Sequence, residues 1–324
     1  MDYITEKFAR LGCDNAPGQE ILQEKSALDL RGEALFGTPV DFSHGDVDAF
    51  KPLPGSLEAF TQGFHAGGRQ AYTEYRGKAA IRADVAGKLS RFTGAKIDPD
   101  ANLILTPGTQ GALFLAMGSL VARGDKAAIV EPDYFANRKL VEFFDGELVP
   151  VPMDFYGSRD RAGLNLDILE AAFKGGAKLF LFSNPNNPTG AVYSADEIRA
   201  IASLAKQYGA ALLVDELYSR QIFDGRPYTH LCAGEELPDN LITIIGPSKT
   251  ESLSGFRLGA AFGSAHIIAR MEKLQAIVSL RAPGYCQAVY KTWFEEPEGF
   301  MQARTAAHQA IRDDIVTALT AVPG

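Results

Sequence analysis

Cysteine is scarce in this chain: there are three in 324 residues, Cys13, Cys232 and Cys286. They are far apart, form no C-x-x-C pair and lack the spacing of metal ligands, so neither a disulfide framework nor a cysteine-based metal site is expected. The five histidines also lack metal-ligand spacing, and no metal site is predicted. Scattered cysteines are typical of reduced thiols in the cytoplasm.

Long apolar runs and an excess of basic residues are also missing. No stretch approaches the about 18 consecutive apolar residues of a membrane span, and the first residues carry charges where a signal peptide has an apolar run. The formal net charge is −8, so no basic surface indicates a nucleic-acid partner. These absences predict a cytoplasmic protein that binds neither nucleic acid nor membrane.

What the chain does contain is a globular composition, with 46% hydrophobic and 22% charged residues, and a repeated pattern of short apolar runs. Each run ends in a turn-rich cluster and is followed by a helical pattern; the runs are 102–106, 126–130, 179–182, 210–214 and 241–245. This alternation predicts an α/β fold with a mostly parallel sheet and helices on both faces. In such sheets ligands bind beyond the carboxyl ends of the strands, where the unusual polar residues of this chain occur.

Composition shifts suggest three regions. Residues 1–50 are predicted to form an N-terminal arm or part of a small domain, ending in a turn-rich segment before Pro52 and Pro54. Residues 51–290 are predicted to form the large domain. Residues 291–324 contain one long amphipathic helix, from about residue 298 to residue 319, with a stripe of apolar side chains.

Two ionisable residues directly follow predicted buried strands. Lys249 would be costly as a buried ammonium. It either extends its charged end to solvent or is the desolvated amine that a Schiff base needs. Asp215 ends the run Ala-Ala-Leu-Leu-Val, where a carboxylate is a helix cap, half of an ion pair, or the partner of another buried cation.

A third feature is the segment Asn-Pro-Asn-Asn-Pro-Thr-Gly at 184–190, which local chemistry alone explains as a rigid turn. With it, the chain resembles the class I/II aminotransferases, the fold type I enzymes that use pyridoxal 5′-phosphate (PLP). The resemblance covers nearly the whole chain, in the family's order. The main matching motifs are 184–190, Asp215-Glu216-Leu217-Tyr218, and Ser248-Lys249 followed by Leu253, Gly255, Arg257 and Gly259. Supporting matches are Tyr72-Thr73, Gly77, 106–110, Gly124-Asp125, Pro132-Asp133-Tyr134 and Arg312-Asp313.

The resemblance implies a PLP site and roles for individual positions. Lys249 is expected to form the Schiff base and move the proton at the substrate Cα, Asp215 to hold the pyridinium proton, and Tyr218 to bond the phenolic oxygen. The further cofactor contacts that it implies are Gly108, Thr109, Gln110, Tyr134, Asn187, Ser248, Arg257 and, across a homodimer interface, Tyr72. Gly45 and Asn187 are expected near the substrate, and the peptide before Pro188 is expected to be cis.

The sequence departs from the family pattern in two places. The family commonly has serine or threonine three residues before the lysine, where this chain has Gly246, so one phosphate contact is expected to be lost or replaced by backbone N–H groups. Family members also continue beyond the long helix into a small C-terminal domain that supplies an arginine for the substrate carboxylate. The second domain is therefore expected to be incomplete here, and we interpret the sequence as a fragment.

The predicted function is a PLP-dependent aminotransferase that moves an amino group between an amino acid and a 2-oxo acid. The same residues support a PLP-dependent lyase or cyclase, because the cofactor stabilises the same carbanion in each reaction. A non-catalytic PLP- or amino-acid-sensing domain and a catalytically silent scaffold are further alternatives. Acidic, aromatic and aliphatic amino acids all stay open as substrates, with His44 a possible contact.

Overall fold

The structure is a computed structural model that describes residues 2–13, 49–154, 156 and 160–322. By its internal contacts the chain divides into two units, Met1–Phe50 and Lys51–Gly324. In the first unit the described structure is helix α1 (Tyr3–Leu11), which Asp2 caps and which ends at Gly12 in the left-handed region. The predicted division of residues 51–324 into a large domain and the start of a second one stays a prediction.

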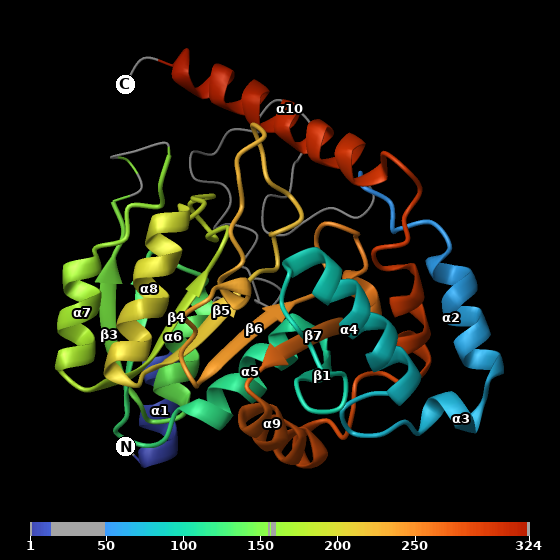
Figure 1. Ribbon diagram of the computed structural model, residues 1–324, viewed down its shortest axis with the longest axis horizontal. Helices are drawn as coiled ribbons and strands as arrows, with labels where there is room; N and C mark the ends of the chain where they lie inside the picture. Colours follow the sequence, from blue (N-terminus) through green and yellow to red (C-terminus); the bar gives the residue numbers. More distant parts are fainter. Residues whose placement is uncertain (1, 14–48, 155, 157–159, 323–324) are drawn as a thin grey trace, which may run out of the picture. The chain divides into compact units, whose positions relative to one another are not determined.

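The second unit alternates helices and strands (Figure 1). Its helices are α2 (Ser56–His65), α3 (Gly68–Ala71), α4 (Ala79–Thr93), α5 (Gly108–Leu120), α6 (Phe135–Phe143), α7 (Leu166–Lys174), α8 (Ala195–Tyr208), α9 (Ala265–Val278) and α10 (Phe300–Thr320), with short 3-10 helices η2 (Leu231–Ala233), η3 (Ser254–Phe256) and η4 (Tyr285–Thr292). Its strands are β1 (Leu103–Pro107), β2 (Lys126–Glu131), β3 (Glu147–Pro152), β4 (Ala177–Ser183), β5 (Ala211–Asp215), β6 (Leu241–Ile245) and β7 (Leu258–Gly263).

The strands form one seven-stranded sheet in the order β1-β7-β6-β5-β4-β2-β3. β7 is antiparallel to both of its neighbours, β1 and β6. The pairs β6–β5, β5–β4, β4–β2 and β2–β3 are parallel. The predicted mostly parallel sheet is confirmed, and all five predicted apolar runs lie in strands.

Both faces of the sheet are covered, as predicted. Because side chains alternate along a strand, Leu212 and Val214 of β5 join the core cluster beneath α4, α7, α8 and η4. Leu213 between them joins a second cluster beneath α5, α6 and α9. Figure 1 shows helices in front of and behind the sheet. The sheet is therefore buried on both faces, and its strands carry the loops at the carboxyl edge.

Two strands, β3 and β7, were not predicted from the sequence. β3 contains Pro150 and Pro152, which a strand tolerates here because β3 lies at the edge of the sheet. β7 contains Gly259 and Gly263, which weaken the apolar signal of a strand. At Gly259 a Cβ would lie 2.3 Å from the carbonyl carbon of Gly108, so glycine allows the backbones to approach closely.

The long C-terminal helix is confirmed as α10, with no residue fully buried. It begins after Gly299, which is in the left-handed region. Across the described part of the chain, no helix is both long and apolar enough to cross a membrane.

Candidate functional site

The segments that follow the central strands meet at one edge of the sheet. The register of β4 and β5 aligns Ser183 with Asp215, and the backbone N–H of Asn184 donates to the carbonyl oxygen of Asp215 at 2.8 Å. β7 starts at this edge too, because its first residue, Leu258, pairs with Pro107 at the end of β1. The topology thus brings together the loops that carry most of the predicted site residues.

Asp215 is a half-buried carboxylate at this edge. Its Oδ1 accepts a hydrogen bond from the backbone N–H of Leu217 at 3.0 Å. Burial, reinforced by the negative charges of Asp133 and Glu216, raises the pKa of Asp215 to about 7. No basic residue in the described ranges contributes to this shift. The carboxylate is therefore placed to gain stability from a positively charged group bound beside it.

Two predicted tyrosines lie next to Asp215. The Tyr134 hydroxyl donates to Oε1 of Gln110 at 3.3 Å. Burial and the charge of Asp215 raise the pKa of Tyr134, and Arg257 acts in the opposite direction. Burial, followed by the charges of Asp215 and Tyr134, raises the pKa of Tyr218 to about 12. These electrostatic effects indicate that Tyr134, Tyr218 and Arg257 lie near one another or near Asp215.

The segment 184–190 is a turn whose asparagines differ in environment. Asn184 and Asn186 are buried, and Asn187 is half-buried. Oδ1 of Asn186 accepts from the backbone N–H and the hydroxyl of Thr189, at 3.1 and 2.7 Å. Within the described residues, no hydrogen bond to the Asn187 side chain is found, so its amide group is not used to stabilise the turn. The peptide before Pro188 is cis, as predicted.

Arg257 lies against the N-terminus of α5. It has a left-handed backbone (φ 53°), and its Nη1 donates to the carbonyl of Ser254 at 3.0 Å. A Cβ on Gly108, the first residue of α5, would lie 2.6 Å from Nη2 of Arg257. The guanidinium and the first turn of the helix therefore form a positively polarised cradle, a combination that binds phosphate groups. Thr109 is in the same turn.

Gly246 is closely packed, which explains the departure from the family pattern. A Cβ there would lie 2.8 Å from Cγ2 of Thr109, 3.0 Å from the carbonyl oxygen of Leu258 and 3.2 Å from Cα of Gly259. The methyl group of Thr109 thus occupies the space that a serine or threonine at position 246 would need.

Lys249 follows β6 in a short loop at the same edge. Its neighbours Ser248 and Thr250 are buried, with exposed fractions of 7% and 2%, whereas Lys249 itself is exposed. Within this single chain the amine is therefore not desolvated, and its role as a Schiff-base lysine stays a prediction.

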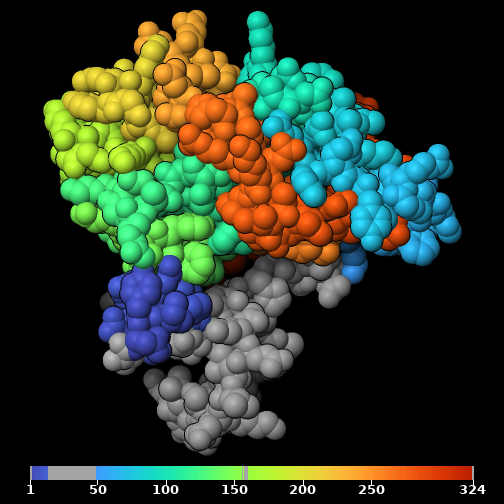
Figure 2. Space-filling view, turned by 90° about the horizontal axis from the view of Figure 1, so that it is seen from below, coloured from blue at the N-terminus to red at the C-terminus, as the bar shows by residue number. Residues whose placement is uncertain are grey.

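Of the two remaining predicted site residues, Tyr72 and Gly45, the structure describes only Tyr72. Tyr72 is 82% exposed, and Arg281 lies over its ring at 5.3 Å from the centroid. Figure 2 shows the segment after α9 at the surface, side by side with α2 and α3. Gly45, like His44, lies outside the described residues.

The structure also groups residues that spacing did not reveal. Nδ1 of His230 and Oε2 of Glu216 are 2.6 Å apart, and possible ligand atoms of Glu216, His230 and Cys232 lie within 4.8 Å of one another. Their separation in sequence hides this grouping. Asp133, the residue before Tyr134, is a second carboxyl near Asp215, and burial raises its pKa to about 6.

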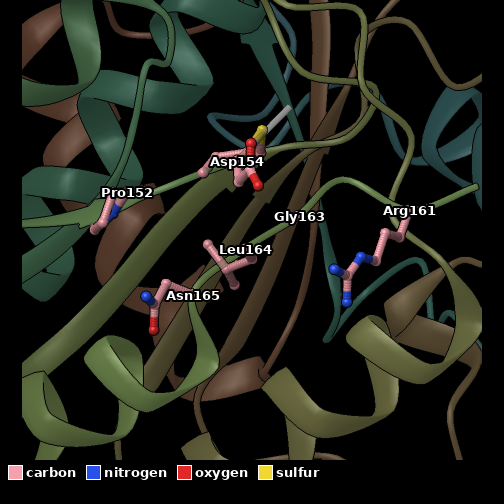
Figure 3. Close-up of a pocket in the computed structure, with 7 residues that line it drawn as sticks. Pro152, Asp154, Arg161, Gly163, Leu164 and Asn165 are labelled. Carbon is pink, nitrogen blue, oxygen red and sulfur yellow. The ribbon is translucent and has the colours of Figure 1, made fainter. Parts of the chain in front are cut away.

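A cavity of about 460 Å³ lies apart from these residues, between the end of β3 and the start of α7. Figure 3 shows Pro152 and Asn165 on one side of it and Arg161 on the other. None of the predicted site residues lines it, so it is not the site that the sequence indicates.

Comparisons of the whole chain with known proteins agree with one another. A model of the family described as "Aminotransferase class I and II" matches residues 38–324. The crystal structure of an aspartate aminotransferase from Rhodobacter sphaeroides is 57% identical, with a TM-score of 0.91 over 99% of this chain and 80% of that one. Kynurenine–oxoglutarate transaminase 1 from Homo sapiens is 27% identical over 96% of this chain and 75% of its own length.

A second solved structure shows similarity of fold alone. The aspartate aminotransferase from Rhizobium meliloti is 24% identical, with a TM-score of 0.80 over 100% of this chain and 76% of that one.

Proposed function

Because the chain belongs to the class I and II aminotransferase family, we propose that it holds PLP on Lys249 and moves an amino group between an amino acid and a 2-oxo acid. The observation that carries this proposal is Asp215. It is a half-buried carboxylate whose pKa is about 7 and whose neighbours in the described residues supply no cation to pair with it.

The residues present fit a phosphate-bearing, protonated pyridine. The cradle formed by Arg257 and the N-terminus of α5 suits a phosphate, and glycine at position 108 allows the guanidinium to lie close to the first turn of the helix. Asp215 suits a pyridinium N–H, because a positive charge there would lower its raised pKa. When bound, PLP withdraws electrons from the substrate Cα, and the protein supplies binding and proton transfer.

We propose a role for each residue. Asp215 would hold a proton at the ring nitrogen, and Tyr134, whose hydroxyl donates to Gln110, would contribute an aromatic side chain to the binding of the cofactor ring. The hydroxyl of Tyr218 and the side-chain amide of Asn187 would donate hydrogen bonds to the phenolic oxygen of the cofactor. Lys249 supplies the amine for covalent attachment and for proton transfer at the substrate Cα.

The substrate and the assembly are also proposals. Aspartate is named for the relative with 57% identity, which supports an acidic amino donor with a 2-oxo acid as acceptor. None of the relatives reported above has the name of a lyase, cyclase or regulator. Tyr72, 82% exposed, is proposed to reach the phosphate of a second copy in a homodimer. A cytoplasmic location remains a prediction, in keeping with three free cysteines.

The test is an assay of 2-oxo acid formation from aspartate and 2-oxoglutarate, with PLP added. We expect Lys249→Ala to lower kcat by about 10²–10⁴-fold, the usual contribution of a positioned acid–base group. Lys96→Ala, at an exposed lysine of the same chain, is the matched control and should keep wild-type activity. Equal activity of Lys249→Ala and Lys96→Ala would refute the proposed role of Lys249.

A further inference from the structure

The loop that carries Lys249, residues 246–253, is a closed turn. The backbone N–H of Leu253 donates to the carbonyl of Pro247 at 3.0 Å, and that of Ser252 donates to the carbonyl of Lys249 at 3.2 Å. Ser252 is in the left-handed region, with φ 57°. A non-glycine residue in this conformation needs support from its surroundings. The position of Lys249 thus depends on what holds the turn.

One support comes from beneath the loop. The Glu251 side chain is fully buried and accepts hydrogen bonds from Arg220 and from the indole Nε1 of Trp293, the latter at 3.2 Å. Arg220 is also paired with Glu296. Because an ion pair in the interior is broken only at high cost, this network anchors the loop to the core.

A second support comes from Arg304 on α10. Its Nη1 donates to the carbonyl of Thr250 at 3.1 Å and to the hydroxyl of Ser252 at 3.0 Å, and its Nη2 donates to the carbonyl of Lys51 at 2.5 Å. The guanidinium also lies over the ring of Phe300, 4.6 Å from the centroid. One side chain therefore binds the residue after Lys249 and the strained residue Ser252 simultaneously.

The same helix binds the other loop of the site. Both Nη atoms of Arg312 pair with Asp224, at 2.7 and 2.8 Å, and the backbone N–H of Asp224 donates to Gln309 at 2.8 Å. Asp224 lies in the segment that follows Tyr218. Figure 1 shows α10 along the side of the molecule toward which the parallel strands point. Helix α10 thus contacts both loops that follow β5 and β6.

We propose that Arg304 is a positioning residue for Lys249. By holding the Thr250 carbonyl and the Ser252 hydroxyl, it keeps the turn closed and fixes where the Lys249 amine is presented to the cofactor. Charge-assisted hydrogen bonds are stronger than neutral ones, so their loss should open the turn measurably. The role of Arg304 in presenting the amine rests on the proposed attachment of PLP to Lys249.

The first test needs no cofactor. In the cofactor-free full chain, hydrogen exchange at the Leu253 amide reports opening of the turn. We expect it to be at least about tenfold faster in Arg304→Ala than in wild type, the effect of losing one hydrogen bond to a charged group. Arg312→Ala, which removes the same side chain from the same helix, should leave the Leu253 rate unchanged. Equal rates in wild type and Arg304→Ala would overturn the proposal.

The second test uses the PLP-loaded protein. The absorbance of the cofactor on Lys249 is titrated against pH, and we expect a shifted midpoint and a lower kcat with little change in KM in Arg304→Ala, partly restored in Arg304→Lys. An unshifted midpoint with unchanged kcat would contradict the proposal. Should Arg304→Ala not fold, Ser252→Ala removes one acceptor instead, and the same outcomes apply.

The two proposals fail in different ways. Absence of a covalent adduct on Lys249 in wild type defeats the proposed function, whereas the exchange rate of Leu253 still tests whether Arg304 holds the turn. A normal adduct in wild type with identical titrations in Arg304→Ala defeats only the role of Arg304.

Discussion

Substituting Gly246 by serine would give this chain the hydroxyl that the family commonly has at that position. The structure predicts that this substitution destabilises the folded protein. The new Cβ would lie 2.8 Å from Cγ2 of Thr109 and 3.0 Å from the carbonyl oxygen of Leu258. A contact under 3 Å forces a neighbour to move. Overpacking of this kind costs about 1–3 kcal/mol, so we expect the free energy of unfolding of Gly246→Ser to fall by that amount.

The clash is removed by a second change. Thr109→Ser deletes the methyl group and keeps the hydroxyl, and because Thr109 is half-buried the cost should stay below about 0.8 kcal/mol, the value for a fully buried group. The double variant should then be about 1 kcal/mol more stable than the sum of the two single changes predicts. Recovery should be incomplete, because the contact with Leu258 persists. Urea unfolding of the cofactor-free proteins measures the free energy of unfolding of the wild type, the two single variants and the double variant, provided that their m-values are equal.

Gly255→Ser is the matched control, because a Cβ on Gly255 meets nothing within 4 Å. Its free energy of unfolding should stay within about 0.5 kcal/mol of wild type. The reasoning would be refuted if Gly246→Ser were as stable as Gly255→Ser, or if the double variant showed no recovery. Either result would mean that Thr109 does not fill the space at position 246.

Three further predictions concern charge and backbone. The folded-state pKa of Asp215 is raised to about 7, so its carboxyl binds more protons in the folded than in the unfolded protein. The free energy of unfolding of the cofactor-free wild type should therefore fall, relative to Asp215→Asn, as pH rises from about 4 to 7. Parallel curves of unfolding free energy against pH for the two proteins would contradict this. Gly108→Ala should weaken PLP binding in an absorbance titration, because its Cβ displaces Arg257, and an unchanged Kd would count against the cradle. Burial raises the pKa of the Glu197 carboxyl, but hydrogen bonds from Ser194 and Ala162 outweigh burial and lower the pKa overall. The ionised carboxylate therefore stabilises the folded protein at pH values above the ordinary glutamate pKa of 4.5, and this stabilisation is lost as pH falls through the lower folded-state pKa. Glu197→Gln should therefore be less stable than wild type at pH 7, with a difference in urea unfolding that shrinks at acidic pH.

The sequence predicted much of the fold because apolar runs and turn residues are local signals. Each predicted run lies in a strand, and α10 occupies nearly the expected range. β3 and β7 were missed because Pro150 and Gly259 depend on where a strand lies in the sheet, which is a tertiary property.

The candidate site divides in the same way. Asp215 was indicated by its place directly after a predicted strand, whereas the expectation for Arg257 came from the family resemblance, because β7 was not predicted. The methyl group of Thr109 beside Gly246 and the hydrogen bond from Arg304 to Thr250 could not be predicted, because each is a contact between segments far apart in sequence. Such contacts leave no trace in local pattern.

The most direct test of the central claim is to reduce the PLP-treated protein with borohydride and map the modified peptide by mass spectrometry. The account predicts the reduced cofactor on Lys249 in wild type and no modified peptide in Lys249→Ala. Modification of another lysine, or an equal yield of adduct in Lys249→Ala, would contradict the assignment of Lys249 as the residue that holds the cofactor.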